Sequence, residues 1–426
     1  MTLAGPLPSG LLPDGASVGD DGRLTLHGHD VVGLAEQFGT PLFVYDEDHL
    51  RARCREARAA FGDGVAYASK AFLCQAMARL AHEEGMMIDV ASGGELHVAL
   101  TAGVPAERCV LHGNNKSTGE LAMAMQAGVG RVVVDSFDEM DRLDALVASG
   151  IPAPSVLLRI TPGVEAHTHE FVMTGQDASK FGFGLASGAA SAALARARES
   201  ESMRLAGLHV HIGSQVFSVD NFAKAVEVVA PLARAADLEE LCVGGGLGVA
   251  YVEGEEAPSI SDWATSVIDV CRSAGVEGRI TAEPGRAIVA QAAMTLYTVG
   301  TIKDLPGIRT YVSVDGGMSD NPRPVLYGSG YETFVPGRAA AERDRAIRLV
   351  GKHCESGDLL VREGWVPADL AVGDVVATPV TGAYGYSMAS NYNRLTRPAV
   401  IFVGSGGVRE VVRRETYADL VRLDVG

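Results

Sequence analysis

Several features are missing from this chain of 426 residues, and each absence excludes a class of protein. No run of about 18 uninterrupted apolar residues occurs, so we expect no membrane-spanning helix. Basic residues are outnumbered, because 36 Lys and Arg against 53 Asp and Glu leave a net charge of −17. Nucleic acid and anionic membranes bind basic surfaces, so neither is an expected partner. An anionic ligand must be held by a few basic side chains or backbone amides.

Closely spaced cysteines are also absent. The six cysteines lie at positions 54, 74, 109, 242, 271 and 354, and none belongs to a C-x-x-C pair. This spacing argues against a disulfide framework and a structural zinc site, and we predict no metal. It favours a reducing, cytoplasmic compartment. Residues 1–20 are rich in Gly, Pro and Asp without the basic-then-apolar order of a signal peptide, so we expect a flexible tail there.

Between residues 64 and 286 the chain alternates short apolar runs with amphipathic segments. Eight strands are predicted, at 65–69, 87–91, 109–112, 131–135, 156–161, 207–212, 241–244 and 279–283. Helical patterns such as 71–84, 119–127, 138–148, 221–236 and 262–274 separate them. This series predicts an α/β fold, an eight-stranded (β/α) barrel over residues 46–290. A doubly wound open sheet is the alternative, but it would more often carry a Gly-rich turn after its first strand.

After about residue 290 the pattern becomes rich in β-strand signals with few helical segments. Strand-like runs occur at 295–302, 311–314, 346–350, 375–379, 400–403 and 408–413. They predict a second, mainly antiparallel β domain over residues 291–426. The segment 21–45 contains two further strand-like runs, at 24–27 and 42–45, and we expect it to join this second domain.

Polar residues end the predicted barrel strands, where the functional face of such a barrel lies. In chain order they are Lys70, Asp89, His112, Asp135, Arg159, His209 with His211, the glycines at 244–246, and Glu283. Lys70 follows the apolar run that begins the barrel. A lysine amine can form a Schiff base with an aldehyde cofactor, although an ordinary loop lysine is the other interpretation.

The remaining strand ends suit the other parts of such a cofactor. The glycine run follows the seventh strand, where barrels often bind phosphate, although a tight turn also explains three glycines. Glu283 is a candidate partner for a protonated ring nitrogen, although a local ion pair with Arg286 also explains it. His211 could stack on a flat cofactor ring or be an ordinary core histidine. Together these residues favour a pyridoxal phosphate pocket. A metal site of His209, His211 and Glu283 is the competing interpretation, but it leaves the lysine and the glycines unexplained.

A set of motifs adds a resemblance to a known family. They are Tyr67-Ala-Ser-Lys70, His112-Gly-Asn-Asn-Lys116, His209-Val-His-Ile-Gly-Ser-Gln215, Gly244-Gly-Gly246, Glu283-Pro-Gly-Arg286, Asp320-Asn-Pro-Arg-Pro324 with Tyr327, Cys354-Glu-Ser-Gly-Asp358, and Tyr384. In this order, from about residue 40 to the C-terminus, the chain resembles the diaminopimelate decarboxylases. These are pyridoxal-phosphate enzymes of the alanine-racemase/ornithine-decarboxylase fold type.

The resemblance implies roles for particular residues. The catalytic set would be Lys70, His211, Glu283 and Cys354. Lys70 would carry the cofactor covalently and exchange it for the substrate amine, and Glu283 would pair with the ring nitrogen. His211 would stack on the ring, and Cys354 would give a proton to the carbanionic carbon. The other cofactor-binding residues would be Asp89, Ser214, Gly244, Gly245, Gly246, Pro284, Gly285, Arg286 and Tyr384.

The resemblance also implies the substrate and the assembly. Arg286, Arg323 and Tyr327 would clamp the distal carboxylate, with Glu355 on the distal amine and Tyr384 beside the substrate. The reaction would be decarboxylation of meso-2,6-diaminopimelate to L-lysine and CO2, the last step of lysine biosynthesis. The protein would be a homodimer in which the Cys354 segment enters the partner's site.

Two alternatives remain at this point. One is a decarboxylase of the same fold that acts on another amino acid, and the other is a non-catalytic pyridoxal-binding regulatory protein. The chain departs from many relatives at Phe72 and in the segment Gly328-Ser-Gly-Tyr-Glu332, and the second departure leaves room for a related substrate. A polar loop at 163–181, with His167, His169 and Lys180, is the segment we consider as a lid.

Overall fold

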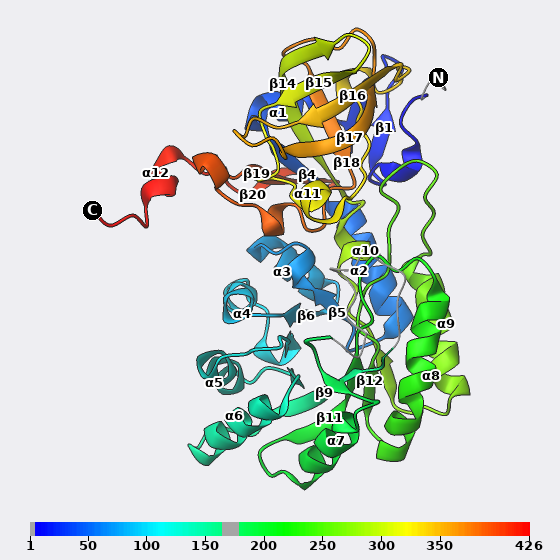
Figure 1. The fold of residues 1–426 in the computed structure, drawn as a ribbon, viewed down its shortest axis with the longest axis vertical. Helices are drawn as coiled ribbons and strands as arrows, with labels where there is room; N and C mark the ends of the chain where they lie inside the picture. The colour runs from blue at the N-terminus through cyan, green and yellow to red at the C-terminus, as the bar shows by residue number, and fades with distance from the viewer. Residues whose placement is uncertain (1–4, 164–178) are drawn as a thin grey trace. The chain divides into compact units, whose positions relative to one another are not determined.

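The computed structural model describes residues 5–163 and 179–426, which form two compact units (Figure 1). The barrel unit comprises Arg53–Val249 and Ala257–Ala287. The β unit comprises Met1–Ala52, Ala250–Glu256 and Ile288–Gly426. Most of the polar loop considered as a lid, including His167 and His169, lies outside the described residues. The chain passes between the units within α2 (Glu47–Phe61) and α10 (Arg286–Val289).

The barrel unit is built on parallel strands that pair side by side in chain order. They are β5 (Ala66–Ala68), β6 (Met87–Val90), β7 (Cys109–Leu111), β8 (Arg131–Val134), β9 (Ser155–Thr161), β11 (Arg204–Val210), β12 (Glu240–Cys242) and β13 (Arg279–Thr281), with β10 (Phe183–Gly184) beside β9. The first and last strands also meet, because the Ala66 and Ala68 amides donate to the carbonyls of Ala282 and Pro284 at 2.9 and 3.1 Å. The predicted eight-stranded (β/α) barrel is confirmed.

Helices follow the strands and lie outside them, as Figure 1 shows for α3 to α6. They are α3 (Gln75–Glu83), α4 (Gly93–Thr101), α5 (Thr118–Ala127), α6 (Phe137–Ala148), α7 (Ala189–Glu199), α8 (Val219–Ala236) and α9 (Ile260–Ser273). Five of them begin at a serine whose hydroxyl accepts a backbone N–H of the first turn, at Ser92, Ser117, Ser136, Ser218 and Ser259. Such caps satisfy amides that a helix start leaves without partners, so the sequence defines where these five helices begin.

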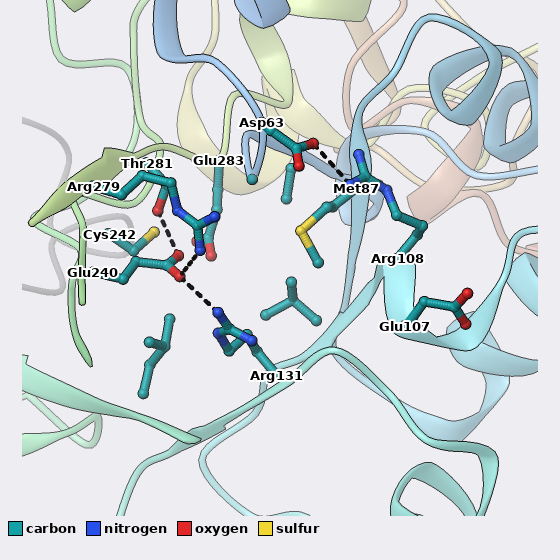
Figure 2. A pocket seen from close by; sticks show the side chains of 14 residues that line it. Asp63, Met87, Glu107, Arg108, Arg131, Glu240, Cys242, Arg279, Thr281 and Glu283 are labelled. Carbon is teal, nitrogen blue, oxygen red and sulfur yellow. Dashed lines mark hydrogen bonds and ion pairs between the residues drawn. The ribbon is translucent and has the colours of Figure 1, made fainter. Parts of the chain in front are cut away.

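The barrel interior changes character along its axis. A buried apolar cluster fills its middle, formed by Ala66, Val110, Val133, Leu157, Ala206 and Cys242. At the amino ends of the strands, a cavity of about 160 Å³ is lined largely by charged side chains (Figure 2). Glu240 accepts hydrogen bonds there from Arg131 at 3.2 Å, Arg279 at 2.6 Å and Thr281 at 2.9 Å. In such barrels, residues at the amino ends of the strands usually stabilise the fold, whereas active sites lie at the carboxyl ends.

The β unit contains a sheet of mixed direction. Its strands are β4 (Leu42–Asp46), β14 (Ala293–Leu305), β15 (Arg309–Val314), β16 (Arg345–Val350), β17 (Leu359–Val366), β18 (Val375–Pro379), β19 (Ala399–Gly404) and β20 (Gly407–Val412). Most pairs are antiparallel, but β15 with β16 and β4 with β19 are parallel. The sequence did not predict β17, because Arg362, Glu363 and Gly364 interrupt its apolar pattern.

The amino-terminal part of the β unit contributes a small sheet and one strand of the large one. The small sheet contains β1 (Ala16–Val18), β2 (Leu24–Leu26) and β3 (His29–Asp30), and α1 (Val31–Phe38) follows it. The short helices α11 (Arg323–Tyr327) and α12 (Tyr417–Val421) lie later in the chain. Among the described residues, no helix is both long and apolar enough to cross a membrane. All six cysteines carry free thiols.

Candidate active site

Glu283 lies at the carboxyl end of the barrel, two residues beyond β13, and is 6% exposed. His112 Nε2 lies 2.9 Å from its Oε1, and His209 Nε2 lies 2.9 Å from its Oε2. Burial by itself would raise the pKa of Glu283, but the two imidazoles hold that pKa well below its usual value. The carboxylate is therefore ionised at neutral pH, the state required to keep a ring nitrogen protonated.

Asp89, at the end of β6, lies near the same pair. His112 Nε2 is 3.7 Å from its Oδ1. Burial raises the pKa of Asp89 to about 6, and the negative charge of Glu283 adds to that rise. Two neighbouring carboxyl groups thus differ in proton affinity, because Glu283 has two histidines at 2.9 Å and Asp89 has only His112, at 3.7 Å.

His211 faces a different environment from His209, although both follow the same strand. Its Nδ1 accepts a hydrogen bond from the Gly245 amide at 3.2 Å, which leaves Nε2 to carry the proton of a neutral ring. Burial, followed by the charges of Lys70 and Arg159, lowers the pKa of His211 well below 6.5. A neutral, flat imidazole is suited to stacking on an aromatic cofactor ring.

The geometry differs from the metal site of His209, His211 and Glu283 considered from the sequence. The described residues bring His112, His209 and Glu283 together, with ligand atoms within 4.8 Å of one another. The set considered from the sequence contained His211 in place of His112, and His211 points its Nδ1 at the glycine turn. Both histidines of the observed cluster instead stabilise the negative charge of Glu283.

The glycine run is required by close packing of the backbone. A Cβ atom at Gly245 would collide with the carbonyl oxygen of Glu283, and one at Gly246 with that of Gly213. Gly244 and Gly246 also adopt positive φ angles of 70° and 112°. Nearby, Arg286 Nη2 donates to Ser214 Oγ at 2.8 Å. Two residues expected to hold phosphate therefore lie side by side in the barrel unit.

Lys70 lies in a single 3-10 turn, Ser69–Ala71, directly after β5. Its side chain is exposed, whereas Ser69 and Ala71 are buried. Gly285 packs so closely against Ala68 and Ala71 that a side chain at 285 would have to displace them. The turn that presents the lysine therefore rests on the turn that follows Glu283.

Arg159, noted on a predicted strand, and Lys116, noted in a motif, were given no role from the sequence. Arg159 on β9 is buried, lies 3.6 Å from Asp135 and stacks over Phe181 at 4.2 Å. Lys116 is also buried, and its ammonium donates to Glu139 at 2.7 Å and to the carbonyls of Gly113 and Val133. These contacts make Lys116 a structural tie between the loop after β7, β8 and α6.

The residues expected at the substrate end lie in the β unit. Arg323 and Tyr327 stand four positions apart in α11 and so share a face of that helix. Arg323 is only 4% exposed, and its Nε has no hydrogen-bond acceptor among the described residues. A buried guanidinium with an unused donor fits a carboxylate ligand. Tyr384 is half-buried and adopts a positive φ of 58°.

Cys354 and Glu355 are exposed in a short loop of the β unit. The Cys354 amide donates to Asn393 Oδ1 at 3.0 Å. Neighbouring His353 is buried, with its amide on Asp358 at 2.8 Å and its Nε2 2.8 Å from Ser319 Oγ. The loop is therefore anchored on both sides of an accessible thiol. Sequence patterns gave no signal for Asn393, which lies 39 residues away.

A lysine at a barrel strand end, an ionised carboxylate, a neutral imidazole and a glycine turn beside Arg286 define a pyridoxal-dependent barrel enzyme. The family model "Pyridoxal-dependent decarboxylase, pyridoxal binding domain" matches residues 47–290. Diaminopimelate decarboxylase of Mycobacterium bovis is 48% identical over 425 residues, covering 95% of each chain. That of Bacillus subtilis is 46% identical over 420 residues, with the same coverage.

Solved structures agree with these relatives. A diaminopimelate decarboxylase from M. jannaschii in co-complex with L-lysine matches with a TM-score of 0.90 at 33% identity, covering 97% of this chain and 98% of that one. The chain belongs to the diaminopimelate decarboxylase family. It is accordingly a carboxy-lyase that uses pyridoxal 5'-phosphate, and the resemblance found in the sequence is confirmed.

Proposed function

We propose that the residues described above decarboxylate meso-2,6-diaminopimelate at its D-centre and release L-lysine and CO2. The family supplies the reaction, since curated relatives over nearly the whole chain are diaminopimelate decarboxylases. The observation that carries the substrate assignment is Arg323, a buried guanidinium whose Nε lacks an acceptor among the described residues. Such a group binds a carboxylate, which the non-reacting end of diaminopimelate provides.

In the barrel unit, Lys70 would hold the cofactor covalently and would exchange it for the substrate amine. When bound, pyridoxal phosphate supplies a ring that accepts the electron pair left by departing CO2. Glu283 keeps the proton on the ring nitrogen, because His112 and His209 maintain its negative charge. His211 covers one face of the ring. The phosphate is held by Ser214, Gly244, Gly245, Gly246, Pro284, Gly285, Arg286 and Tyr384, with Asp89 also in the cofactor set.

In the β unit, Arg323 and Tyr327 bind the distal carboxylate together with Arg286, and Glu355 binds the distal amine. Tyr384 contacts both substrate and phosphate. Glu355 Oε1 already accepts the Gly357 amide at 3.1 Å, which orients the carboxylate within its own turn. This recognition requires a substrate that is an amino acid at both ends.

Cys354 gives the proton to the carbon that has lost CO2, and it does so across a homodimer interface. Its exposure supports this assignment, because the thiol lies at the surface of the β unit. Large apolar side chains exposed in the same unit also support a dimer, among them Val325, Leu326 and Tyr392. The six free thiols are consistent with a cytoplasmic location.

The domain boundaries are part of the same proposal: a segment at 21–45 joined to the β domain, a barrel over 46–290 and a β domain over 291–426. The flexible tail expected at 1–20 is wrong for its described part, because Leu11 and Leu12 are buried and Ala16–Val18 pairs with β2. The pyridoxal-binding family model, which matches residues 47–290, supports the barrel boundaries. Pairing of β4 with β14 and β19 supports the assignment of the segment at 21–45.

Borohydride reduction of the holoenzyme tests the cofactor assignment. The absorbance band of the protein-bound cofactor should disappear, and peptide mapping should find the reduced pyridoxyl group on Lys70. Buried Lys116 serves as an internal control, because its ammonium is engaged by Glu139 and two carbonyls. A label on any lysine other than Lys70 would overturn the assignment.

A further inference from the structure

Arg323 lies beside two tyrosine rings to which the sequence gave no role. Its guanidinium carbon is 4.2 Å from the centre of the Tyr251 ring and 5.5 Å from that of the Tyr331 ring. Arg323 Nη1 donates to the hydroxyl of Tyr331, and the two rings meet edge to face with centroids 5.2 Å apart. Tyr251 and Tyr331 are 4% and 2% exposed. The cation thus contacts two buried aromatic rings, and cation–π attraction is stronger at such a site than in water.

The Tyr331 hydroxyl also hydrogen-bonds the side chain of Asn321. Asn321 Oδ1 in turn accepts the backbone N–H of Arg323 at 3.4 Å. The phenol therefore connects the guanidinium to the turn from which α11 begins. Fixing both ends of a long side chain reduces the rotamer freedom that ligand binding would otherwise have to remove.

One buried arginine joins the two segments that carry these rings. Arg343 Nη1 donates to Glu332 at 2.9 Å, one residue after Tyr331. Its Nη2 donates to Glu253 at 3.2 Å, two residues after Tyr251. The Glu253 amide also donates to the Glu332 side chain at 3.2 Å. Residues 250–256 lie between β12 and α9 in the chain but belong to the β unit. The contacts of Arg343, Glu253 and Glu332 therefore hold Tyr251 beside Arg323.

We propose that Tyr331 and Tyr251 are positioning residues that set the selectivity of Arg323 for a carboxylate. Tyr331 uses one edge of the guanidinium and Tyr251 covers a face. The Nε atom then has no acceptor among the described residues and is left for a carboxylate. The inference rests on the proposed role of Arg323 in binding the distal carboxylate. It places one determinant of this selectivity in the segment 328–332, which carries Tyr331.

Two ligands that differ by one carboxylate test the proposal. L-Lysine carries the distal carboxylate, and 1,5-diaminopentane is the same molecule without it. Inhibition constants of both are measured with the holoenzyme decarboxylating meso-diaminopimelate. Tyr331→Phe removes the hydroxyl and keeps the ring, so Arg323 loses the bond that orients it and the inhibition constant of L-lysine should rise about 10-fold. That of 1,5-diaminopentane should stay within about 2-fold of wild type.

Tyr311→Phe is the matched control, because it makes the same change on β15 beside another arginine, Arg309, at 5.8 Å. It should alter neither constant. Tyr251→Leu, which removes a ring from the face of Arg323, is the second variant and should show the same lysine-selective loss. An equal rise for both ligands, or no change for either, would overturn the proposal.

Arg323→Lys separates this inference from the function on which it depends. If Arg323→Lys raises the inhibition constant of L-lysine and Tyr331→Phe does not, only the positioning role is wrong. If Arg323→Lys leaves L-lysine binding unchanged, the proposed carboxylate site itself is wrong. Bound cofactor, followed by its absorbance, should remain at the wild-type level in every variant.

Discussion

At the scale of single residues, two carboxyl groups at the carboxyl end of the barrel, Glu283 and Asp89, have pKa values shifted in opposite directions. His112 and His209 each lie 2.9 Å from an oxygen of Glu283, whereas Asp89 has one histidine at 3.7 Å. The pKa of Glu283 is held well below its usual value, and burial raises that of Asp89 to about 6. The ionised group is the one that the proposed function assigns to the ring nitrogen.

Replacing the charge of Glu283 should therefore affect the reaction more than the fold. Glu283→Gln keeps the shape but removes the negative charge, so kcat should fall by about 100-fold or more, as when other preorganised electrostatic groups are lost. The cofactor should still bind, as its absorbance would show. Glu240→Gln is the control at the other end of the barrel: it weakens the bonds from Arg131 and Arg279, so it should lower Tm and leave kcat nearly unchanged. A kcat loss shared equally by both variants would contradict this account.

Asp320 in the β unit makes stability depend on pH. Its carboxyl is buried, which raises its pKa to about 7, and Asp315 and Asp358 add to the rise. The unfolded group titrates near pH 4, so between about pH 4 and 7 the folded protein binds more protons than the unfolded one. The contribution of Asp320 to the free energy of unfolding therefore decreases as pH rises from about 4 to 7.

Asp320→Asn should remove that penalty. The amide oxygen can still accept the Gly317 N–H that Asp320 accepts at 2.9 Å. Tm should rise by about 5 °C at pH 8 and change little at pH 4, where the wild-type carboxyl is already protonated. Thermal unfolding at both pH values measures this. An equal shift at both would mean that ionisation of Asp320 is not the cause.

The positions of several proposed site residues could be predicted because each lies at or just after the end of a barrel strand. Lys70, Asp89, His211 and Glu283 all follow from reading which side chains end a barrel strand. The contacts of His112 and His209 with Glu283 could not be predicted, because they join strands that come together only in the closed barrel. Tyr251 and Tyr331 were missed for the same reason, since their segments are 80 residues apart in the chain.

At the scale of elements, the Cys354 loop depends on a 3-10 turn, Tyr392–Arg394, late in the chain. Asn393 adopts a left-handed conformation, with φ 50° and ψ 22°, and its Oδ1 accepts the Cys354 amide at 3.0 Å. Its Oδ1 also lies 3.2 Å from His353 Nδ1. Asparagine tolerates this conformation better than most residues, and its side chain supplies the acceptor.

Asn393→Ala should loosen the proposed proton donor without touching the cofactor. We expect kcat to fall about 10-fold, because the loop loses the acceptor of the Cys354 amide and the left-handed conformation becomes less favourable. KM should change much less. Asn393→Asp keeps an acceptor oxygen and should recover most of the activity. Loss of bound cofactor in Asn393→Ala would show instead that the turn supports the cofactor pocket.

The elements themselves were largely predictable. All eight barrel strands and the change to β structure after residue 290 followed from periodicity, because buried parallel strands are short, apolar and separated by amphipathic helices. Strand β17 was missed, since it has two exposed charged residues in succession before Gly364. The two parallel pairs of the β unit also lacked a local signal, because strand direction depends on connections that periodicity does not reveal.

At the scale of the whole molecule, the chain combines two units whose sequences interrupt each other. Residues 250–256 lie within the barrel sequence but belong to the β unit. The proposed catalytic set is similarly divided: Lys70, His211 and Glu283 lie in the barrel unit, and Cys354 lies in the β unit. If the active sites are shared across a dimer, two inactive variants can complement each other.

Mixing Lys70→Ala with Cys354→Ala protein tests this sharing. In an equal mixture with free subunit exchange, half of the dimers are mixed and each has one complete site, so activity should recover to about one quarter of wild type. Mixing Lys70→Ala with His211→Ala is the control, because both residues come from one barrel and no complete site forms. Recovery in the control, or none in the test despite proven exchange, would argue against shared sites.

The central claim is that this chain converts meso-diaminopimelate to L-lysine, and product release tests it most directly. Holoenzyme is supplied separately with meso-diaminopimelate, L-lysine, D-lysine and L-ornithine, and CO2 and amine products are quantified. We predict one L-lysine for each CO2 from diaminopimelate and negligible CO2 from the other three, which lack a second carboxylate for Arg323. Comparable turnover of L-lysine or L-ornithine, or no L-lysine from diaminopimelate, would contradict the account.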